Sequence, residues 1–347
     1  MRPAPLIAAL AIGMLMMNAA PAQAADTARA KDLCLGRSAS LDQRMAGCTA
    51  LIDARTETGR PLAMAYCNRG HVLNERHDYA RAIADFDQGI KVDATYACLF
   101  SNRGRALAFL GQFDKAIADY DEAIRLDPKF ALAYNNRGDA YGHKNDLDHA
   151  IADFTAAIGI DPNFAAAYAN RARIYYVKGD AERAIADYTS VIEIRPSVEA
   201  FLNRGNAFRD LDQLDRALAD YGVIVDNAPQ DARGWRNRGL VKLMKKDAAG
   251  AIADYDRAIA LDPNDAFSFN NRGMAHALRK ELDRALADFD TALRLGAESP
   301  TIQANRGDAL RQKGDRPGAI AAYRAALALQ PGFDRAVAAL ERMGVRP

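Results

Sequence analysis

The sequence has little of what enzymes commonly use for chemistry. Its 347 residues include five histidines, four cysteines and one tryptophan. The histidines are scattered, with no HExxH arrangement and no cysteine and histidine spacing of the kind that binds zinc. The glycines occur singly and form no phosphate-binding loop. We therefore expect no catalytic activity, no cofactor and no metal site.

An excess of charge of one sign is also missing, because 46 basic residues face 45 acidic residues. Nucleic acids and anionic membranes attract basic surfaces, so this balance argues against both as partners. After the first residues, no apolar run is as long as a membrane-spanning helix, which needs about eighteen residues. We expect no membrane insertion.

The N-terminus has the pattern of a secretory signal peptide. Arg2 gives a positive start, an apolar run extends from Leu6 to Met17, and small residues follow at Ala22 and Ala24. Residues 1–24 are the expected signal peptide, with cleavage after Ala24. The expected location is periplasmic or secreted, in a bacterium.

Four cysteines follow this segment, an even number that suits disulfides in an oxidising compartment. Three pairings are possible. We favour Cys34 with Cys48, because a short spacing across a helical hairpin is easily bridged. The remaining pair would be Cys67 with Cys98. Free buried thiols are the alternative.

What the sequence has in abundance is repetition. An Asn-Arg-small tripeptide recurs at intervals of 33 or 34 residues. A fixed period of this length indicates stacked repeats, each of which buries its apolar face against its neighbours. The tripeptides begin at Asn68, Asn102, Asn136, Asn170, Asn203, Asn237, Asn271 and Asn305.

Each repeat has the pattern of two amphipathic helices. In the second repeat, apolar and small residues recur three and four apart from Phe100 to Leu107 and from Phe113 to Ile124. Gly111 supplies the turn, and Pro128 follows the second helix. The eight expected repeats are 63–96, 97–130, 131–164, 165–197, 198–231, 232–265, 266–299 and 300–333.

Residues 25–62 depart from this pattern, as terminal units of a repeat array commonly do. Leu41 to Ile52 nevertheless aligns with Leu147 to Ile158, which is a second helix. We expect an N-terminal capping hairpin here, closed by the Cys34–Cys48 disulfide. Arg60 and Pro61 are expected to break the chain before the first repeat.

Aromatic residues recur in both helices and are expected to form the core. Those of the first helices are Tyr66, Phe100, Tyr134, Tyr168, Phe201, Trp235 and Phe269. Those of the second helices are Phe86, Tyr120, Phe154, Tyr188, Tyr221, Tyr255, Phe289 and Tyr323. Single glycines such as Gly104 and alanines such as Ala116 mark where the two helices approach closely.

The order of aromatic, glycine, alanine, aromatic and proline resembles the tetratricopeptide repeat family over residues 63–333. The resemblance implies an all-α fold, a right-handed α-solenoid of eight tandem helical hairpins. Their first helices would line a concave groove that binds peptides or protein segments. Residues 334–347 resemble the C-terminal solvating helix that closes such arrays. The family implies no chemistry of its own.

One position departs from the family, because arginine precedes the glycine in every repeat. These residues are Arg69, Arg103, Arg137, Arg171, Arg204, Arg238, Arg272 and Arg306. Aspartates recur in the second helices at Asp85, Asp119, Asp153, Asp187, Asp220, Asp254 and Asp288. The eighth repeat has Ala322 instead, so we expect each aspartate to pair with the arginine of the next repeat. An arginine-lined anion channel is the alternative.

In this family, ligand contacts lie mainly at the second, fifth, ninth, twelfth and thirteenth positions of a repeat. Cys67 and Cys98 occupy two such positions in adjacent repeats, which is why we pair them. An apolar patch bordered by arginines would suit an apolar segment with acidic neighbours. The candidate groove residues are Arg173, Leu202, Arg209, Arg233, Arg236, Leu240, Leu243, Met244, Phe267, Met274 and Leu278. Several of them could instead pack within the helical layer.

The sequence thus predicts a non-catalytic protein–protein interaction module. It would bind a peptide or protein segment and act as an adaptor or assembly factor in the bacterial cell envelope. The alternatives are a self-associating structural scaffold and a docking regulator of an envelope enzyme. Neither the identity of the partner nor the oligomeric state follows from the sequence.

Overall fold

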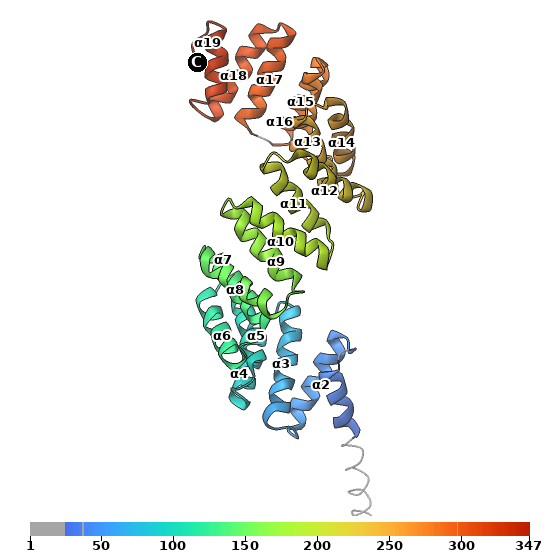
Figure 1. Ribbon diagram of the computed structural model, residues 1–347, viewed down its shortest axis with the longest axis vertical. Helices are drawn as coiled ribbons and strands as arrows, with labels where there is room; N and C mark the ends of the chain where they lie inside the picture. The colour runs from blue at the N-terminus through green and yellow to red at the C-terminus, as the bar shows by residue number, and fades with distance from the viewer. Residues whose placement is uncertain (1–24, 37, 297) are drawn as a thin grey trace, which may run out of the picture. The chain divides into compact units, whose positions relative to one another are not determined.

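The computed structural model describes residues 25–36, 38–296 and 298–347 (Figure 1). These residues contain helices and no strand. The expected signal peptide, residues 1–24, lies outside the described residues. Across the described part, no helix has both the length and the apolar character to cross a membrane. The chain divides into an N-terminal half, which ends at Ile174, and a C-terminal half, which begins at Tyr175.

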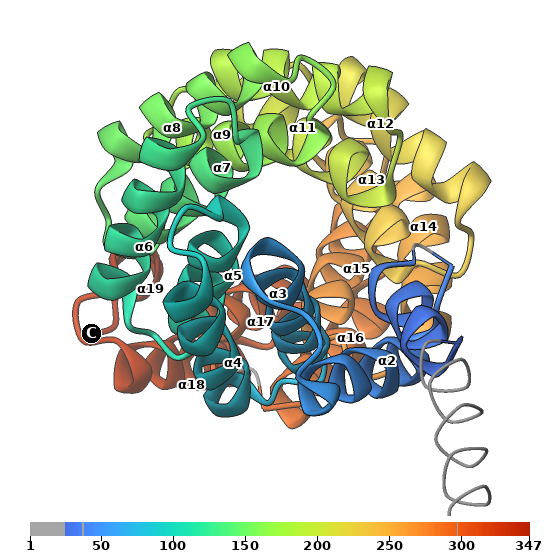
Figure 2. The same ribbon diagram turned by 90° about the horizontal axis from the view of Figure 1, so that it is seen from below.

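In the N-terminal half, consecutive helices pack against each other in chain order. The first helices of the repeats, α3, α5 and α7, lie on the inner side of this half, and their partners α4, α6 and α8 lie outside (Figure 2). Residues 25–35 are helical. The next helices are α2 (Leu41–Ala54), α3 (Gly59–Glu75), α4 (Tyr79–Val92), α5 (Ala97–Phe109), α6 (Phe113–Leu126), α7 (Ala131–His143), α8 (Leu147–Ile160) and α9 (Ala165–Val177). The last residues of α9 belong to the C-terminal half.

The C-terminal half repeats the same arrangement of helical hairpins and ends with a single helix against α18. Its helices are α10 (Ala181–Ile194), α11 (Val198–Asp210), α12 (Leu214–Asn227), α13 (Ala232–Met244), α14 (Ala248–Leu261), α15 (Ala266–Leu278), α16 (Leu282–Arg294), α17 (Pro300–Lys313), α18 (Arg316–Leu329) and α19 (Asp334–Arg342). Buried residues of α19, such as Ala336 and Leu340, join the last core cluster.

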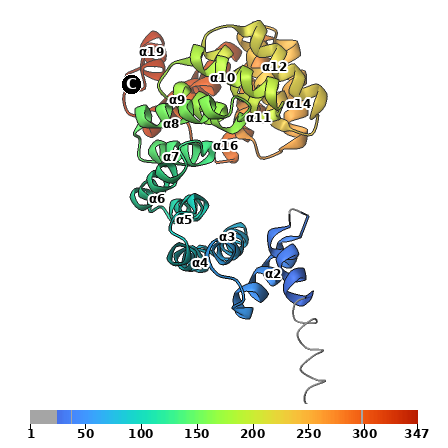
Figure 3. The ribbon, with the colours of Figure 1, turned by 60° about the horizontal axis from the view of Figure 1, so that its bottom comes forward.

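The N-terminal cap contains the expected disulfide between Cys34 and Cys48. Both cysteines are fully buried, and α2 packs on α3 (Figure 3). The expected break at Arg60 and Pro61 is wrong, because both residues lie in the first turn of α3. A proline is tolerated in the first turn of a helix, where its missing N–H has no partner within the helix.

The turn between the two helices of each repeat has a positive φ at one position. Gly111 takes this conformation, as predicted, with φ of 73°. Five of the eight turns use a residue with a side chain there, which costs more than glycine. The eight residues are His77, Gly111, Asn145, Gly179, Asp212, Lys246, Lys280 and Gly314.

The second-helix aromatics form the predicted core, and all eight are buried. The glycine of the first helix lies against this ring: a Cβ at Gly104 would lie 2.9 Å from a ring carbon of Tyr120. The first-helix aromatics are less deeply buried: Phe100 is buried and the other six are half-buried, with Phe201 and Phe269 packed against core clusters. Each of these rings lies beneath the arginine three residues later, with 4.9–5.8 Å between guanidinium carbon and ring centroid.

Candidate functional site

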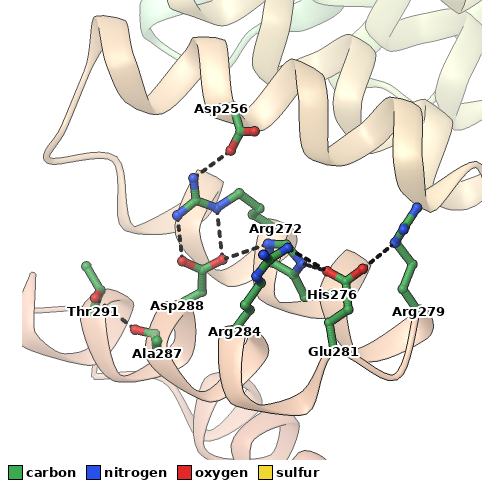
Figure 4. Close-up of polar contacts among 9 residues, drawn as sticks. All are labelled: Asp256, Arg272, His276, Arg279, Glu281, Arg284, Ala287, Asp288 and Thr291. Atoms are coloured by element: carbon green, nitrogen blue, oxygen red, sulfur yellow. Dashed lines mark hydrogen bonds and ion pairs between the residues drawn. The ribbon is translucent and has the colours of Figure 1, made fainter.

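The repeated arginine is the centre of a polar network, shown for Arg272 in Figure 4. Its Nε and Nη2 donate hydrogen bonds of 2.9 and 2.7 Å to the two carboxylate oxygens of Asp288, in the second helix of the same repeat. Its Nη1 donates a 2.7 Å hydrogen bond to Asp256 of the preceding repeat. One guanidinium therefore joins the two helices of its own repeat and reaches back to the previous repeat.

The prediction that each aspartate pairs with the arginine of the next repeat is wrong. The bidentate pairs lie within a repeat, and they are Arg69–Asp85, Arg103–Asp119, Arg137–Asp153, Arg204–Asp220, Arg238–Asp254 and Arg272–Asp288. The contact between repeats uses the residue two positions after that aspartate. Arg103, Arg137, Arg272 and Arg306 contact Asp87, Asp121, Asp256 and Asp290, whereas Arg171 and Arg204 contact Thr155 and Thr189.

These contacts give the arginines a structural role, and the aspartates compensate the positive charge that an anion channel would need. Hydrogen bonds from Arg103 to Asp119 raise the pKa of the guanidinium. Burial raises the pKa of Asp119, and Arg103 acts in the opposite direction. Desolvation thus offsets part of the attraction, as is usual for a partly buried ion pair.

The predicted groove patch of the C-terminal half separates into exposed and packed residues. Phe267, Met274 and Leu278 of α15 are 47, 38 and 51% exposed, and Met244 at the end of α13 is 45% exposed. Leu240 is half-buried. Leu202 packs against the cluster around Tyr221, and Leu243 against the cluster around Tyr255. Leu202 and Leu243 thus match the alternative in which several of these side chains pack within the helical layer.

The four arginines predicted to border the apolar patch are not free to bind a ligand carboxylate, because each already has a carboxylate partner. The pairs are Arg173 with Asp139, Arg209 with Asp210, Arg233 with Asp231 and Glu199, and Arg236 with Asp265. Arg173 belongs to the N-terminal half, whereas the other candidate residues belong to the C-terminal half. The exposed apolar surface therefore has no border of uncompensated guanidinium groups.

A cavity of about 320 Å³ lies beside Met274 and Leu278, between α15 and α17. Lys280, in the turn after α15, lines it together with Asp308 and Arg335. Among the described residues, no carboxylate lies within the 4.0 Å ion-pair distance of the Lys280 Nζ. The structure thus adds Lys280, which the sequence analysis did not single out.

Hydrogen bonds hold Asn305, Asp308 and Arg335, three residues of the cavity wall. The Asn305 side-chain amide donates a 2.9 Å hydrogen bond to the Asn270 side-chain oxygen. Arg335 of α19 donates a 2.8 Å hydrogen bond to the Asn305 side chain and also pairs with Asp308. The cavity wall is therefore held in place before any ligand arrives.

The N-terminal half has its own cavity, of about 510 Å³. Its lining includes Phe109, Phe113 and His143, together with Arg105 and Asp139. Phe109 is 58% exposed, and Phe113 stacks on His143 with 5.0 Å between ring centroids. Arg105 pairs with Glu75, so its charge is compensated.

The expected Cys67–Cys98 disulfide is absent, because the two residues are thiols with their sulfurs 3.3 Å apart. The sequence placed them correctly on adjacent first helices, but the bond itself was predicted wrongly for this structure. Within the described part of the chain, no three histidine, cysteine or acidic side chains are grouped to hold a metal ion.

Family models cover most of the repeat region. Models described as tetratricopeptide repeat match residues 63–96, 131–164, 165–197, 202–266 and 270–334, and one described as TPR repeat matches residues 104–144. The chain belongs to the tetratricopeptide repeat family. Proteins of this family bind peptide or protein partners, and the chain is a protein–protein interaction module. Comparison with curated proteins gives no match.

Solved structures support the same fold. A tetratricopeptide repeat protein from Parabacteroides merdae has a TM-score of 0.54 at 18% identity, covering 71% of this chain and 98% of that chain. A chain of the APC/C hetero-tetramer Cut9–Hcn1 has a TM-score of 0.53 at 17% identity, covering 92% and 87%. PilF of Pseudomonas aeruginosa has a TM-score of 0.52 at 19% identity, covering 61% and 97%. These identities show the fold alone.

Proposed function

We propose that the C-terminal half binds a segment of a partner protein along α15, at the cavity between α15 and α17. An apolar side chain of the segment occupies the cavity, and a neighbouring carboxylate pairs with Lys280. The observation that carries this proposal is the exposure of Met274 and Leu278, two large apolar side chains of α15 that line that cavity. Phe267, near the start of the same helix, is also exposed.

The physical argument has two parts. Burial of apolar surface contributes about 25 cal/mol per Å², so covering Met274 and Leu278 supplies affinity. A charge at the edge adds orientation and association rate more than affinity. Lys280 suits this role because its ammonium group has no carboxylate partner among the described residues.

The biological role that we propose is that of an adaptor or assembly factor in the bacterial cell envelope. Its support is the signal-peptide pattern of residues 1–24 in the sequence. The groove would hold one envelope protein while other surfaces of the array remain free. Fractionation of cells that express the full chain tests the location: the mature protein should appear in the periplasm or the medium, and retention in the cytoplasm would contradict the role.

Selection of phage-displayed random peptides tests the groove. We expect wild type to enrich peptides that combine a large apolar residue with a neighbouring Asp or Glu. The double variant Met274→Asp/Leu278→Asp should lose these peptides. The matched control is Leu329→Asp, which changes a similarly exposed leucine at the end of α18 and should retain them. Equal binding by the double variant and wild type would remove the proposal.

A charge exchange sharpens this experiment. Lys280→Glu should shift the preference from acidic to basic neighbours while the apolar residue is kept. An unchanged preference would exclude Lys280 from recognition. Sedimentation at two concentrations addresses the scaffold alternative, because a self-associating scaffold would form larger species without any peptide.

A further inference from the structure

Two thiols face each other on adjacent first helices of the N-terminal half. Cys67 lies in α3 and Cys98 in α5, and the Cys67 thiol donates a hydrogen bond to the Cys98 sulfur over 3.3 Å. The Asn102 side-chain nitrogen donates to both sulfurs, at 3.4 Å from Cys67 and 3.2 Å from Cys98. Cys67 is 1% exposed, whereas Cys98 is partly exposed. Reagents in solution therefore reach Cys98 first.

The surroundings of Cys98 favour its thiolate form. Cys98 is the second residue of α5, where the partial positive charge of a helix N-terminus stabilises an anion. The hydrogen bond from Cys67 is the largest cause that lowers the pKa of Cys98, which falls to about 7, and Tyr96 and Asn102 act in the same direction. The pKa of Cys67 is raised, first by its hydrogen bond with Cys98 and then by burial.

We propose that Cys67 and Cys98 form a thiol–disulfide exchange site whose substrates are small or exposed disulfides, with Cys98 as the attacking residue and Cys67 as the resolving residue. This site is separate from the α15 groove of the C-terminal half. It goes beyond peptide binding because it makes and breaks a covalent bond.

The exchange consists of two balanced steps. The Cys98 thiolate attacks one sulfur of a disulfide R–S–S–R, which forms a Cys98–S–S–R bond and releases one RS⁻. Cys67 then loses its proton and attacks the Cys98 sulfur, which forms the Cys67–Cys98 disulfide and releases the second RS⁻. The protein loses two electrons and two protons, and the substrate disulfide is reduced to two thiols once protonated.

The two cysteine pairs of this chain have different roles in this proposal. Cys34 and Cys48 are already bonded and fully buried inside the cap, so they offer no thiol. Cys67 and Cys98 are close enough to bond after small movements, and Cys98 stays accessible at a groove position. The first pair is structural, and the second pair can change between dithiol and disulfide.

The test uses 5,5′-dithiobis(2-nitrobenzoate), a disulfide that releases a coloured thiolate. The full chain is first treated with mild dithiothreitol under native conditions, and peptide mapping confirms that Cys34–Cys48 is intact. Wild type should then release two thiolates per chain and keep no label. Cys67→Ser should release one and keep one label on Cys98, and Cys98→Ser should react at least tenfold more slowly.

Three results would overturn the proposal. They are a Cys67–Cys98 bond in wild type that resists mild reductant until the protein unfolds, a Cys98→Ser variant that reacts as fast as wild type, and a label retained on wild type. Circular dichroism checks that both variants fold. If Cys98→Ser does not fold, the pH profile of iodoacetamide alkylation on wild type decides: its midpoint should lie at about 7, and a midpoint near the ordinary value of 9.0 would contradict the proposal. Peptide binding at α15 is measured separately and does not depend on either result.

Discussion

The side of α15 that faces α16 and the side that faces the groove are built from different kinds of residue. Toward α16, Gly273 lies against the Phe289 ring and Arg272 pairs with Asp288, and the same types recur in most repeats. On the other side, Met274 and Leu278 are exposed, and other repeats carry different residues at these positions. The difference separates the residues that make the repeat fold from those that can select a partner.

Of the changes to the two sides of α15, breaking the ion pair on the α16 side should reduce the free energy of unfolding most. Asp288→Ala leaves Arg272 without its bidentate partner in a mostly buried site, so we expect a loss of about 3 kcal/mol in the free energy of unfolding. The double variant Arg272→Met/Asp288→Leu should lose less, because no charge is stranded. Urea denaturation followed by circular dichroism measures both. Equal losses would mean that the pair itself is not what stabilises the contact.

Filling the glycine position should have the next largest effect. A Cβ at residue 273 would lie 2.8 Å from a ring carbon of Phe289 and 3.1 Å from the Ala285 carbonyl oxygen. Gly273→Val should therefore cost about 1–3 kcal/mol through overpacking. Gly222→Ala in α12 is the control, because a Cβ added at residue 222 would have no atom within 4 Å and alanine favours a helix. A loss of stability in the control as large as in Gly273→Val would contradict the packing argument.

The contact between repeats should contribute less than the contact within a repeat. The Asp256 side chain is 55% exposed in its pair with Arg272, whereas that of Asp288 is 8% exposed. Asp256→Ala should cost less than about 1 kcal/mol, since water screens an exposed pair. Thermal melts of the two alanine variants compare them directly. If Asp256→Ala destabilised the protein as much as Asp288→Ala, the contact between repeats would contribute as much as the contact within a repeat, which contradicts the prediction.

Substitutions on the groove side of α15 should leave the stability of the protein almost unchanged. Met274→Asp and Leu278→Asp change exposed side chains, so the free energy of unfolding should change by less than about 0.5 kcal/mol. Urea denaturation of the double variant measures this, with wild type as reference. A large loss would show that these residues support the fold, and the separation between the two sides of α15 would fail.

The sequence was sufficient for the repeated part of the fold. Gly111 in the turn, Pro128 after the second helix and the buried Tyr120 all lie where the period placed them. The pairing of Arg272 was not predictable in the same way. Asp288 follows it by 16 residues and Asp254 precedes it by 18, and a periodic sequence repeats both spacings in every unit. Only the packing of the helices decides between the two carboxylates.

The site was less predictable because residues next to each other in the sequence differ in burial. Leu243 packs against the cluster around Tyr255, whereas Met244, the next residue, is exposed. A turn of 100° along a helix separates them, and the packing of α13 against α14 of the same repeat decides which one is covered. Lys280 was missed because its position is defined by the left-handed turn, and nothing in the pattern indicates that its side chain lines a cavity.

The double contact of the repeated arginine has a consequence for how such a chain can change length. Arg137 reaches Asp121 of the preceding repeat, 16 residues earlier, and Asp153 of its own repeat. If residues 97–130 were removed, Asp87 would stand 16 residues before Arg137 and could take the place of Asp121. Loss of this repeat would therefore preserve both kinds of partner of Arg137, so that a gene-level event of this size could shorten the array and keep the junction at Arg137.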